Sequence, residues 1–313
     1  MIRVPMARLA LALLLMAPLF MKPWAANARV LEAGPGKPFK QPSEAIGAAG
    51  PGDTVRIAPG EYFDCAFVRQ DGLIIEGAGP GVILTDKTCG GKALLVISGA
   101  NVTVRNLTLQ RARVPDRNGA GIRAEGGDLL VQNTQFINNE NGLMSAASPA
   151  ASIRVLNSQF IGNGRCLGAC SHGIYAGQIK LLRVEKSRFL DTHEGHHIKS
   201  RALRTEVIEC DIQDGPTGTS SYLIEIPNGG SLLAERNRMQ KGALSQNQGN
   251  TISIGAEGVS QPTAEITLRG NVFANDQGRE TVFVNNLTAT RAQLSGNVFR
   301  GQVKPLVGDG DSR

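Results

Sequence analysis

Four histidines lie close together in this sequence, near other side chains that can exchange protons. All the histidines of the chain fall within 26 residues, at His172, His193, His196 and His197. Tyr175, Lys199 and Arg201 lie within or directly after the same stretch. Imidazole, phenol and amine groups serve as acids and bases in catalysis, so this stretch is the first candidate for an acid–base site.

The chemistry that these residue types suit is the removal of a proton from a uronic acid. Such a reaction needs a group that neutralises the carboxylate, a base for the ring proton and an acid for the departing oxygen. Arg201 could hold the carboxylate through two parallel hydrogen bonds. Lys199 is the expected base, because Arg201 and a protonated His197 would lower its pKa. Tyr175 or His172 is the expected acid.

Other polar residues near this stretch are expected to contact the substrate. The predicted binding residues are Arg123, His193, His196, Tyr222 and Glu225. Glu225 complicates the assignment of Lys199 as a base, because a neighbouring carboxylate favours a charged amine. Glu225 could instead orient Lys199 or help to bind a cation, which leaves calcium open as a cofactor.

Two alternative interpretations of these residues involve no acid–base catalysis. Lys199 and Glu225 could form an ordinary cross-strand ion pair, while the histidines bond to loop carbonyls. Three histidines and a nearby acidic residue could also bind zinc. We do not favour a metal site, because His196 and His197 are adjacent and point to opposite sides of an extended chain.

A sequence repeat supplies the elements that must position these residues. A short segment with alternating apolar residues recurs about every 27 residues, which is the signature of a solenoid. Its last apolar residue is Leu109, Phe136, Phe160, Phe189, Ile212, Met239, Phe273 or Phe299. One earlier unit near Ile75 brings the total to about nine. The pattern predicts an all-β, single-stranded, right-handed parallel β-helix of about nine coils.

A second strand type alternates with the first and carries the candidate site. Ile122, Ile174 and Ile198 should point inward, so their neighbours should form an outward column with about 4.8 Å between strands. The members of this column are Arg123, Met144, Tyr175, Lys199, Glu225, Ser253 and Phe283. A parallel column two residues further along contains Glu125, Arg201 and Asn285.

Small polar residues just before the repeated apolar position predict a hydrogen-bonded ladder inside the solenoid. They are Thr108, Thr134, Ser158, Ser187, Cys210, Asn237, Asn271 and Asn297. Stacked side chains of this kind can bond from coil to coil, and Asn tolerates the left-handed backbone of a tight corner.

The segment 42–62, PSEAIGAAGPGDTVRIAPGEY, resembles the opening of proteins in the pectate-lyase-like β-helix superfamily. The resemblance implies a short capping helix, with Ser43 as its N-cap, before the first strand. With the coils that follow, it covers nearly all of residues 29–313. It implies the fold and no particular activity, since that superfamily includes lyases, hydrolases, esterases and epimerases.

One closer likeness fails at the residues that would perform catalysis. The residues Ser171-His172-Gly173 and Ile198-Lys199 are similar to motifs of polygalacturonases. Those hydrolases use aspartates from the two preceding coils. The corresponding segments here, 120–124 and 141–145, contain no aspartate. The sequence therefore does not support glycoside hydrolysis of that type.

Residues 1–28 are predicted to be a cleaved signal peptide, followed by a β-helix domain at residues 29–313. Arg3 and Arg8 precede an apolar stretch at 9–21, and 26–28 have the small-x-small pattern of a cleavage site. No later stretch is apolar enough to span a membrane. The mature protein should therefore be periplasmic or secreted.

Five cysteines in an oxidising compartment predict two disulfides. Cys166 and Cys170 share one short loop, and Cys65 and Cys89 lie about one repeat apart, so stacking could bring the second pair together. Cys210 is left over.

The net charge of +6 includes three basic residues of the predicted leader, so the mature chain is only mildly basic. This balance gives no basic stripe for nucleic acid. The leading prediction is a monomeric, exported protein that acts on an acidic polysaccharide as a lyase or epimerase. The alternative is a non-catalytic polysaccharide-binding or assembly protein of the cell envelope, which the poverty in aromatic rings favours.

Overall fold

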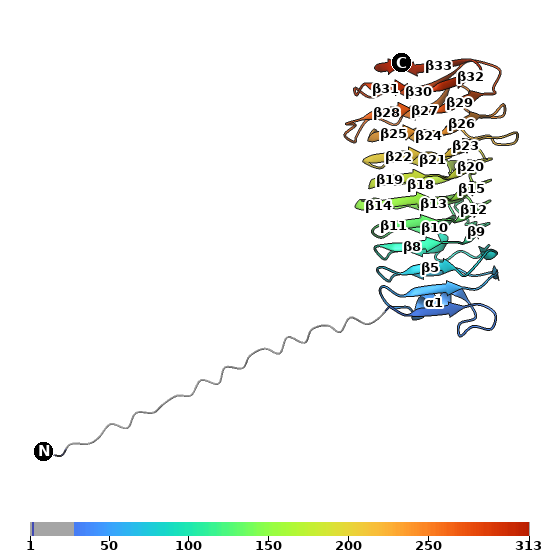
Figure 1. The fold of residues 1–313 in the computed structure, drawn as a ribbon, viewed down its shortest axis with the longest axis vertical. Coiled ribbons are helices and arrows are strands. Elements are labelled where there is room, and N and C mark those ends of the chain that lie inside the picture. Colours follow the sequence, from blue (N-terminus) through green and yellow to red (C-terminus); the bar gives the residue numbers. More distant parts are fainter. Residues whose placement is uncertain (1, 3–27, 313) are drawn as a thin grey trace.

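Three long parallel sheets, stacked coil upon coil, form a column in the computed structural model (Figure 1). The structure describes residues 2 and 28–312, except for the side chain of Leu167. The predicted signal peptide therefore lies almost wholly outside the described residues. Each coil contributes one strand to each sheet, so residues distant in sequence become neighbours in space.

Sheet 1 has 12 strands and runs the full length of the column. It consists of β1 (Val30–Ala33), β2 (Thr54–Ile57), β5 (Ile74–Gly77), β8 (Val102–Arg105), β11 (Leu129–Gln132), β14 (Ser148–Leu156), β19 (Ile179–Glu185), β22 (Arg204–Ile208), β25 (Ser231–Glu235), β28 (Ile266–Arg269), β31 (Ala292–Ser295) and β34 (Gly310–Ser312).

Sheet 2 has 10 strands and contains the second strand type that the sequence predicts. It consists of β4 (Ala66–Val68), β7 (Ala93–Ile97), β10 (Ala120–Ala124), β13 (Asn141–Ser145), β18 (Ile174–Ala176), β21 (Ile198–Ser200), β24 (Ile224–Ile226), β27 (Asn250–Ile254), β30 (Thr281–Asn286) and β33 (Val303–Val307).

Sheet 3 also has 10 strands, and a small hairpin lies outside the three sheets. Sheet 3 consists of β3 (Gly60–Tyr62), β6 (Val82–Thr85), β9 (Thr108–Gln110), β12 (Gln135–Ile137), β15 (Gln159–Ile161), β20 (Arg188–Leu190), β23 (Asp211–Gln213), β26 (Arg238–Lys241), β29 (Val272–Asn275) and β32 (Val298–Arg300). The hairpin pairs β16 (Cys166–Leu167) with β17 (Ala169–Cys170).

The strand numbers give about 11 turns rather than the nine that the repeat predicts. The difference lies mainly at the first coils, which are shorter than the repeat. Thr54 on β2 pairs with Ile74 on β5, a separation of only 20 residues. Their residues at the repeated apolar position, Tyr62 and Leu84, are only 22 positions apart, so a period of about 27 does not reveal them.

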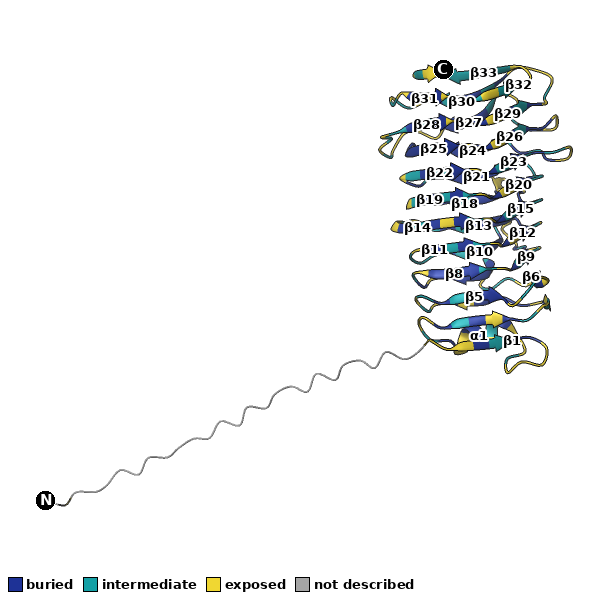
Figure 2. Cartoon of the chain, viewed as in Figure 1, coloured by how far each residue is buried: buried dark blue, intermediate teal, exposed yellow. Residues whose placement is uncertain are grey.

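The predicted apolar positions stack as a continuous internal column. Phe136 pairs in register with Phe160, and Phe160 with Phe189. Their rings lie parallel with centroids 4.5 and 4.6 Å apart, which is close to the distance between strands. In Figure 2, buried residues follow the strands, while exposed residues lie mainly in the bends and near the two ends of the column.

A short helix, α1 (Pro42–Ala48), covers the first coil as predicted, but it begins before Ser43. The N-cap is Gln41, and Glu44 accepts hydrogen bonds from the backbone N–H groups of Lys40 and Gln41. Pro42 explains the difference, because its fixed φ and missing N–H suit the first helical position. Ser43 is therefore inside the first turn, where its N–H donates to Asp64.

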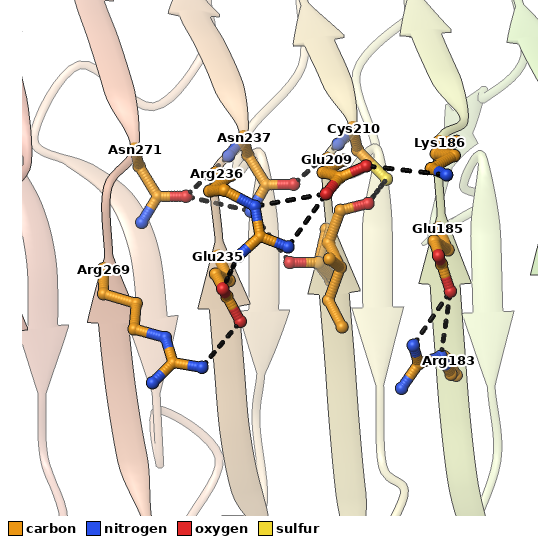
Figure 3. Close-up of polar contacts among 12 residues, drawn as sticks. Arg183, Glu185, Lys186, Glu209, Cys210, Glu235, Arg236, Asn237, Arg269 and Asn271 are labelled. Carbon is orange, nitrogen blue, oxygen red and sulfur yellow. Dashed lines mark hydrogen bonds and ion pairs between the residues drawn. The ribbon is translucent and has the colours of Figure 1, made fainter.

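The predicted ladder forms at the corner between sheets 1 and 3 (Figure 3). Asn237 accepts a hydrogen bond from the Cys210 N–H at 2.9 Å, and its own N–H donates to Asn271 at 3.0 Å. Ser158 and Ser187 repeat the pattern at lower coils. Thr108 is not a member, because it is already on β9.

The left-handed backbone falls one residue before the ladder position rather than on it. Lys186, Glu209 and Arg236 have φ values of 50°, 53° and 52°. Their side chains pair from coil to coil, with Glu209 lying 3.8 Å from Lys186 and 2.8 Å from Arg236 (Figure 3). Asn133 and Asn157 occupy the same position in earlier coils, where an amide side chain tolerates this conformation.

Candidate functional site

The predicted outward column forms on sheet 2 over the middle of the solenoid. Tyr175 on β18 pairs in register with Lys199 on β21, and Lys199 pairs with Glu225 on β24. The inward isoleucines, Ile174 and Ile198, are fully buried as expected. Parallel pairing in this register therefore brings together three side chains from separate coils.

A cleft of about 460 Å³ lies over this column. Its lining includes Met144, His172, Tyr175, His196, Lys199 and Arg201. The hairpin β16–β17 contributes Ala169 and Cys170 to one edge, so the loop that the disulfide closes forms part of the wall. Most of the predicted catalytic residues thus share one hollow.

Two carboxylates surround the cations at the centre of the cleft. Lys199 Nζ lies 2.9 Å from Glu225 Oε2 and 2.6 Å from Glu257 Oε1. Arg201 Nη2 lies 2.6 Å from Glu257 Oε2. Burial would raise the pKa of Glu257, but hydrogen bonds from Lys199 and Arg201 outweigh it and hold the pKa below its usual value. We expected Lys199 to be crowded by positive charges, and it is instead paired with negative ones.

Arg201 also contacts the side chain of Tyr175. Its Nε donates to the Tyr175 hydroxyl at 3.0 Å, and its guanidinium carbon lies 5.8 Å from the centre of the Tyr175 ring. A second nitrogen, Nη1, donates to Asn228. Because these contacts use different edges of the guanidinium fork, Arg201 fixes the tyrosine relative to the cations.

His172 and His196 stack at the floor of the cleft, with ring centroids 4.6 Å apart. His172 Nδ1 accepts a hydrogen bond from the backbone N–H of His196 at 3.0 Å, and His196 Nδ1 accepts one from Tyr222 at 3.3 Å. A neutral imidazole that accepts at Nδ1 carries its proton on Nε2. Both rings therefore present Nε2–H groups as donors.

Burial keeps both imidazoles neutral. It lowers the pKa of His172 well below the ordinary value, and the nearby His196, Lys199 and Arg201 lower it further. Burial also lowers the pKa of His196, although Glu225, whose Oε2 is 3.0 Å from His196 Nε2, opposes this effect. Neutral donors beside charged groups are a feature of many acid–base sites.

His197 does not reach the cleft, in contrast to the prediction. It is fully buried inside the solenoid, where Nδ1 lies 2.8 Å from Thr192 Oγ1 and Nε2 lies 2.9 Å from Asp214 Oδ1. The reason is its place at a corner. On the two preceding coils that position holds Gly142 and Gly173, where an added Cβ would approach the Phe160 ring or the next backbone.

The equivalent corner of a later coil explains a second wrong prediction, which placed Phe283 in the outward column. The register pairs Ser253 with Asn285, so Asn285 continues the outward column in place of Phe283. Phe283 is fully buried, with its ring centroid 5.2 Å from those of Phe273 and Phe299. Two successive residues point inward where a strand leaves a corner, and simple alternation does not anticipate this.

The remaining predicted binding residues lie around the cleft rather than in its centre. His193 lies in an adjoining hollow, which Arg117 and Arg165 also line, and its Nε2 is 3.6 Å from Asp191. Arg123 is two coils below Tyr175, with Nη1 2.9 Å from the Met144 sulfur. The Tyr222 ring stands 5.1 Å from His196, and burial raises the pKa of its hydroxyl.

Sequence reasoning missed Glu257. It lies in the loop between β27 and β28, 58 residues after Lys199, and the loop length differs from coil to coil. The only available signal was the flanking pair Gly255 and Gly258, both in the left-handed region at φ 87° and 90°. Within the described part of the chain, no group of three His, Cys, Asp or Glu residues is arranged to hold a metal ion.

Both expected disulfides are present. Cys65 joins Cys89 and Cys166 joins Cys170, with Cα atoms 5.5 and 4.1 Å apart. Cys210 is buried in the ladder, and burial raises the pKa of its thiol to about 12, so it is an unreactive group.

Comparisons with known proteins support the fold. No protein-family model matches the sequence, and no curated protein is significantly similar to it. Among solved structures, pectate lyase Pel9A is similar with a TM-score of 0.64 and 14% identity, over 92% of this chain and 79% of that one. The alginate lyase from Paenibacillus sp. str. FPU-7 gives 0.56 and 16%, over 91% and 99%. A Geobacillus virus E2 protein, ORF18, gives 0.57 and 15%, over 84% and 55%.

The chain therefore has the pectate-lyase-like parallel β-helix fold, as the opening segment suggested. Identities this low establish the architecture alone. No helix among the described residues is long and apolar enough to cross a membrane.

Proposed function

We propose that this protein binds a uronate-containing polysaccharide in the sheet 2 cleft and removes the ring proton next to the carboxylate, a step that lyases and epimerases share. The observation that carries the proposal is that Lys199 and Arg201 together hold one carboxylate, that of Glu257, beside the Tyr175 hydroxyl. Two structural neighbours, a pectate lyase and an alginate lyase, are named for acidic polysaccharides, which agrees with this substrate class.

Lys199 and Arg201 would bind the uronate carboxylate. Neutralising a carboxylate makes the neighbouring C–H group more acidic, because the negative charge that develops on proton removal is stabilised. This role differs from the expected one, in which Lys199 is the base. The two carboxylates near its ammonium favour binding over proton abstraction.

Tyr175 would transfer the proton. The Arg201 Nε–H group donates to its oxygen at 3.0 Å and so holds this oxygen beside the two cations. The phenolate removes the ring proton and becomes a phenol. In a lyase the phenol then returns this proton to the linking oxygen as the carbon–oxygen bond breaks and a carbon–carbon double bond forms. In an epimerase solvent water gives a proton to the opposite face of the same carbon, and Tyr175 releases the proton that it removed to solvent.

His172 and His196 would position the sugar rather than act as bases. Their Nδ1 atoms are occupied by backbone N–H groups, so neither neutral ring has a free acceptor nitrogen. The His172 Nε2–H group can donate to a sugar or carboxylate oxygen, whereas that of His196 lies 3.0 Å from Glu225. Tyr222 and Arg123 would contact neighbouring sugar units along the cleft.

We further propose that the protein works outside the cytoplasm, as a periplasmic or secreted monomer. The Cys65–Cys89 and Cys166–Cys170 disulfides support an oxidising compartment. The signal peptide at residues 1–28 remains a prediction from the sequence. N-terminal sequencing of the exported protein tests it, with cleavage after Ala28 as the expected result.

A binding protein without catalysis is the second candidate. Every cation at the centre of the cleft is paired with a carboxylate, which suits an anion-binding site as well as a catalytic one. Retained binding of polyuronates with no product under any condition would favour this candidate.

The test is incubation of the mature protein with pectate, alginate and other acidic polysaccharides, with and without calcium. Ultraviolet absorbance detects the unsaturated uronate of a lyase, and deuterium uptake from heavy water detects an epimerase. We expect Tyr175→Phe and Lys199→Ala to abolish the signal. Lys180→Ala, an exposed lysine on β19, is the matched control and should keep it. Loss of signal in the control as well would contradict the assignment of the site.

A further inference from the structure

A carboxylate from a distant loop pairs with both Lys199 and Arg201, the two cations that line the cleft. Glu257 places one oxygen 2.6 Å from Lys199 Nζ and the other 2.6 Å from Arg201 Nη2. Each oxygen therefore contacts a different cation, and the carboxyl group bridges two residues of one coil, Lys199 on β21 and Arg201 just after it. A carboxylate on a sugar ring could make the same two contacts.

Glu257 is the outermost member of the cluster. Its side chain is 40% exposed, while those of Lys199 and Arg201 are 11% and 22% exposed. The other carboxylate, Glu225, is only 5% exposed and belongs to β24, so it cannot leave without disrupting the sheet. Of the two carboxylates, only Glu257 can be displaced from the solvent side.

The backbone of the loop that carries Glu257 is bonded to residues 226–228, for example from the Ser260 N–H to the Asn228 carbonyl at 3.0 Å. The Glu257 N–H donates to the Pro227 carbonyl at 2.9 Å, and the Asn228 amide donates to the Gly258 carbonyl at 3.3 Å. Residues 256–260 are exposed. Because these bonds hold the backbone, release of Glu257 from the cations requires only rotation of its exposed side chain.

We propose that Glu257 occupies, in the free protein, the position that a uronate carboxylate takes in the complex. The incoming carboxylate displaces the Glu257 side chain, which rotates outward into solvent. This inference rests on the proposed function and narrows its substrate class to polymers with free carboxylates. A methyl ester carries no charge, so it cannot replace Glu257 between two partly buried cations.

The replacement of Glu257 by substrate also explains why the free protein is stable although Lys199 and Arg201 lie close together in the cleft. Partly buried charges without partners are costly, and Glu257 supplies the partner until substrate arrives. The substrate must then compete with an internal carboxylate, which weakens its apparent affinity.

The experiment compares Glu257→Gln with Glu265→Gln by titration calorimetry. Glu265 is the matched control, because it is 41% exposed and pairs with Arg204 on sheet 1, away from the cleft. The probes are oligogalacturonate and oligomannuronate, each as the free acid and as the methyl ester. We expect Glu257→Gln to bind a free-acid probe about tenfold more tightly than the parent protein, with no gain for the esters. Glu265→Gln should bind like the parent.

The outcomes separate this inference from the proposed function. If the parent binds a free-acid probe and Glu257→Gln binds it no more tightly, the displacement is wrong and the proposed function stands. If Glu257→Gln bound the methyl esters more tightly by the same factor, the gain in affinity would not come from replacing one carboxylate by another, and the inference would be overturned. If neither the parent nor Glu257→Gln binds any probe, both the proposed function and the inference fail.

Discussion

The coil that contains β21 has two adjacent histidines, one on its outer side and one on its inner side, and the surroundings of the two differ. His196 faces the cleft, and the adjacent His197 faces the core. Both lie close to a carboxylate, at 3.0 Å from Glu225 and 2.9 Å from Asp214. The two histidines therefore share the same residue type and the same kind of partner, and they differ in the side of the coil that they face.

On the inner side every polar group has a fixed partner. Asp214 accepts hydrogen bonds from His197, Ser220 and Ser245 and from the backbone N–H of Gly242. Burial alone would raise the pKa of Asp214, but these bonds hold it at about 2. Together they join consecutive coils through the interior.

On the outer side Glu225, the partner of His196, is fixed on β24, but other partners are exchangeable. Glu257 reaches the cations from a loop and is partly exposed, and His172 lines a hollow that a ligand could enter. Polar groups whose hydrogen-bond partners are all buried and fixed indicate a structural role. Polar groups whose partner is exposed and can be replaced by a ligand indicate a binding or catalytic role. Four predictions test this distinction.

The largest effect is expected for Asp214→Ala. It leaves several buried donors without an acceptor, so the free energy of unfolding should fall by about 3–5 kcal/mol. Urea denaturation measures the change. Asp211→Ala, three residues earlier and at the surface, is the control and should change stability by less than about 0.5 kcal/mol. A loss below about 1 kcal/mol for Asp214→Ala would show that the inner network contributes little.

Arg201→Lys should impair activity without a large loss of stability. Lysine keeps the charge but cannot contact Tyr175, Asn228 and Glu257 at once, so kcat/KM on a polyuronate should fall about 100-fold. Steady-state kinetics on the purified variant measures it. Arg204→Lys, an arginine of sheet 1 paired with Glu206 and Glu265, should behave like the parent. Comparable losses in both variants would argue against a special role for Arg201.

Acid should destabilise the protein through the neutral histidines. The pKa of His172 is below 6.5 in the folded state, so only the unfolded chain gains a proton as the pH falls through 6.5. Stability should therefore decrease below that pH by at most about 1.4 kcal/mol per pH unit for this group. His172→Asn, whose side-chain oxygen can accept the same N–H, should flatten the slope measured by denaturation at several pH values. An unchanged slope would exclude His172 as the source.

The smallest effect is expected for His193→Ala. This side chain is 45% exposed and lies outside the cleft, so unfolding should change by less than about 0.5 kcal/mol and activity by less than about twofold. Thermal denaturation and kinetics test both parts. A strong loss of activity would extend the functional site to the neighbouring hollow.

Much of the fold could be predicted from the repeat. The stacked phenylalanines, the ladder of small polar residues and the alternation around Ile174 and Ile198 all follow from local patterns. Each depends on residues that recur at a fixed position in a coil. The first coils were missed because they are shorter than the repeat, as the pairing of Thr54 with Ile74 shows.

The candidate site could be predicted in part. The order Tyr175, Lys199, Glu225 followed from one register, and the structure has it. The prediction that His197 faces outward was wrong, because corner residues depart from strict alternation. Glu257 could not be found, since no pattern fixes where a loop of variable length returns to the sheet.

The sequence by itself determined the solenoid, because each coil repeats the same apolar spacing and can only bury it against its neighbours. It also determined which strands bring the histidines, the tyrosine and the lysine to one region. Only the tertiary structure decided which groups are paired there. That choice depends on contacts between residues up to 58 positions apart, such as Lys199 with Glu257, and on burial that differs between the two sides of one strand.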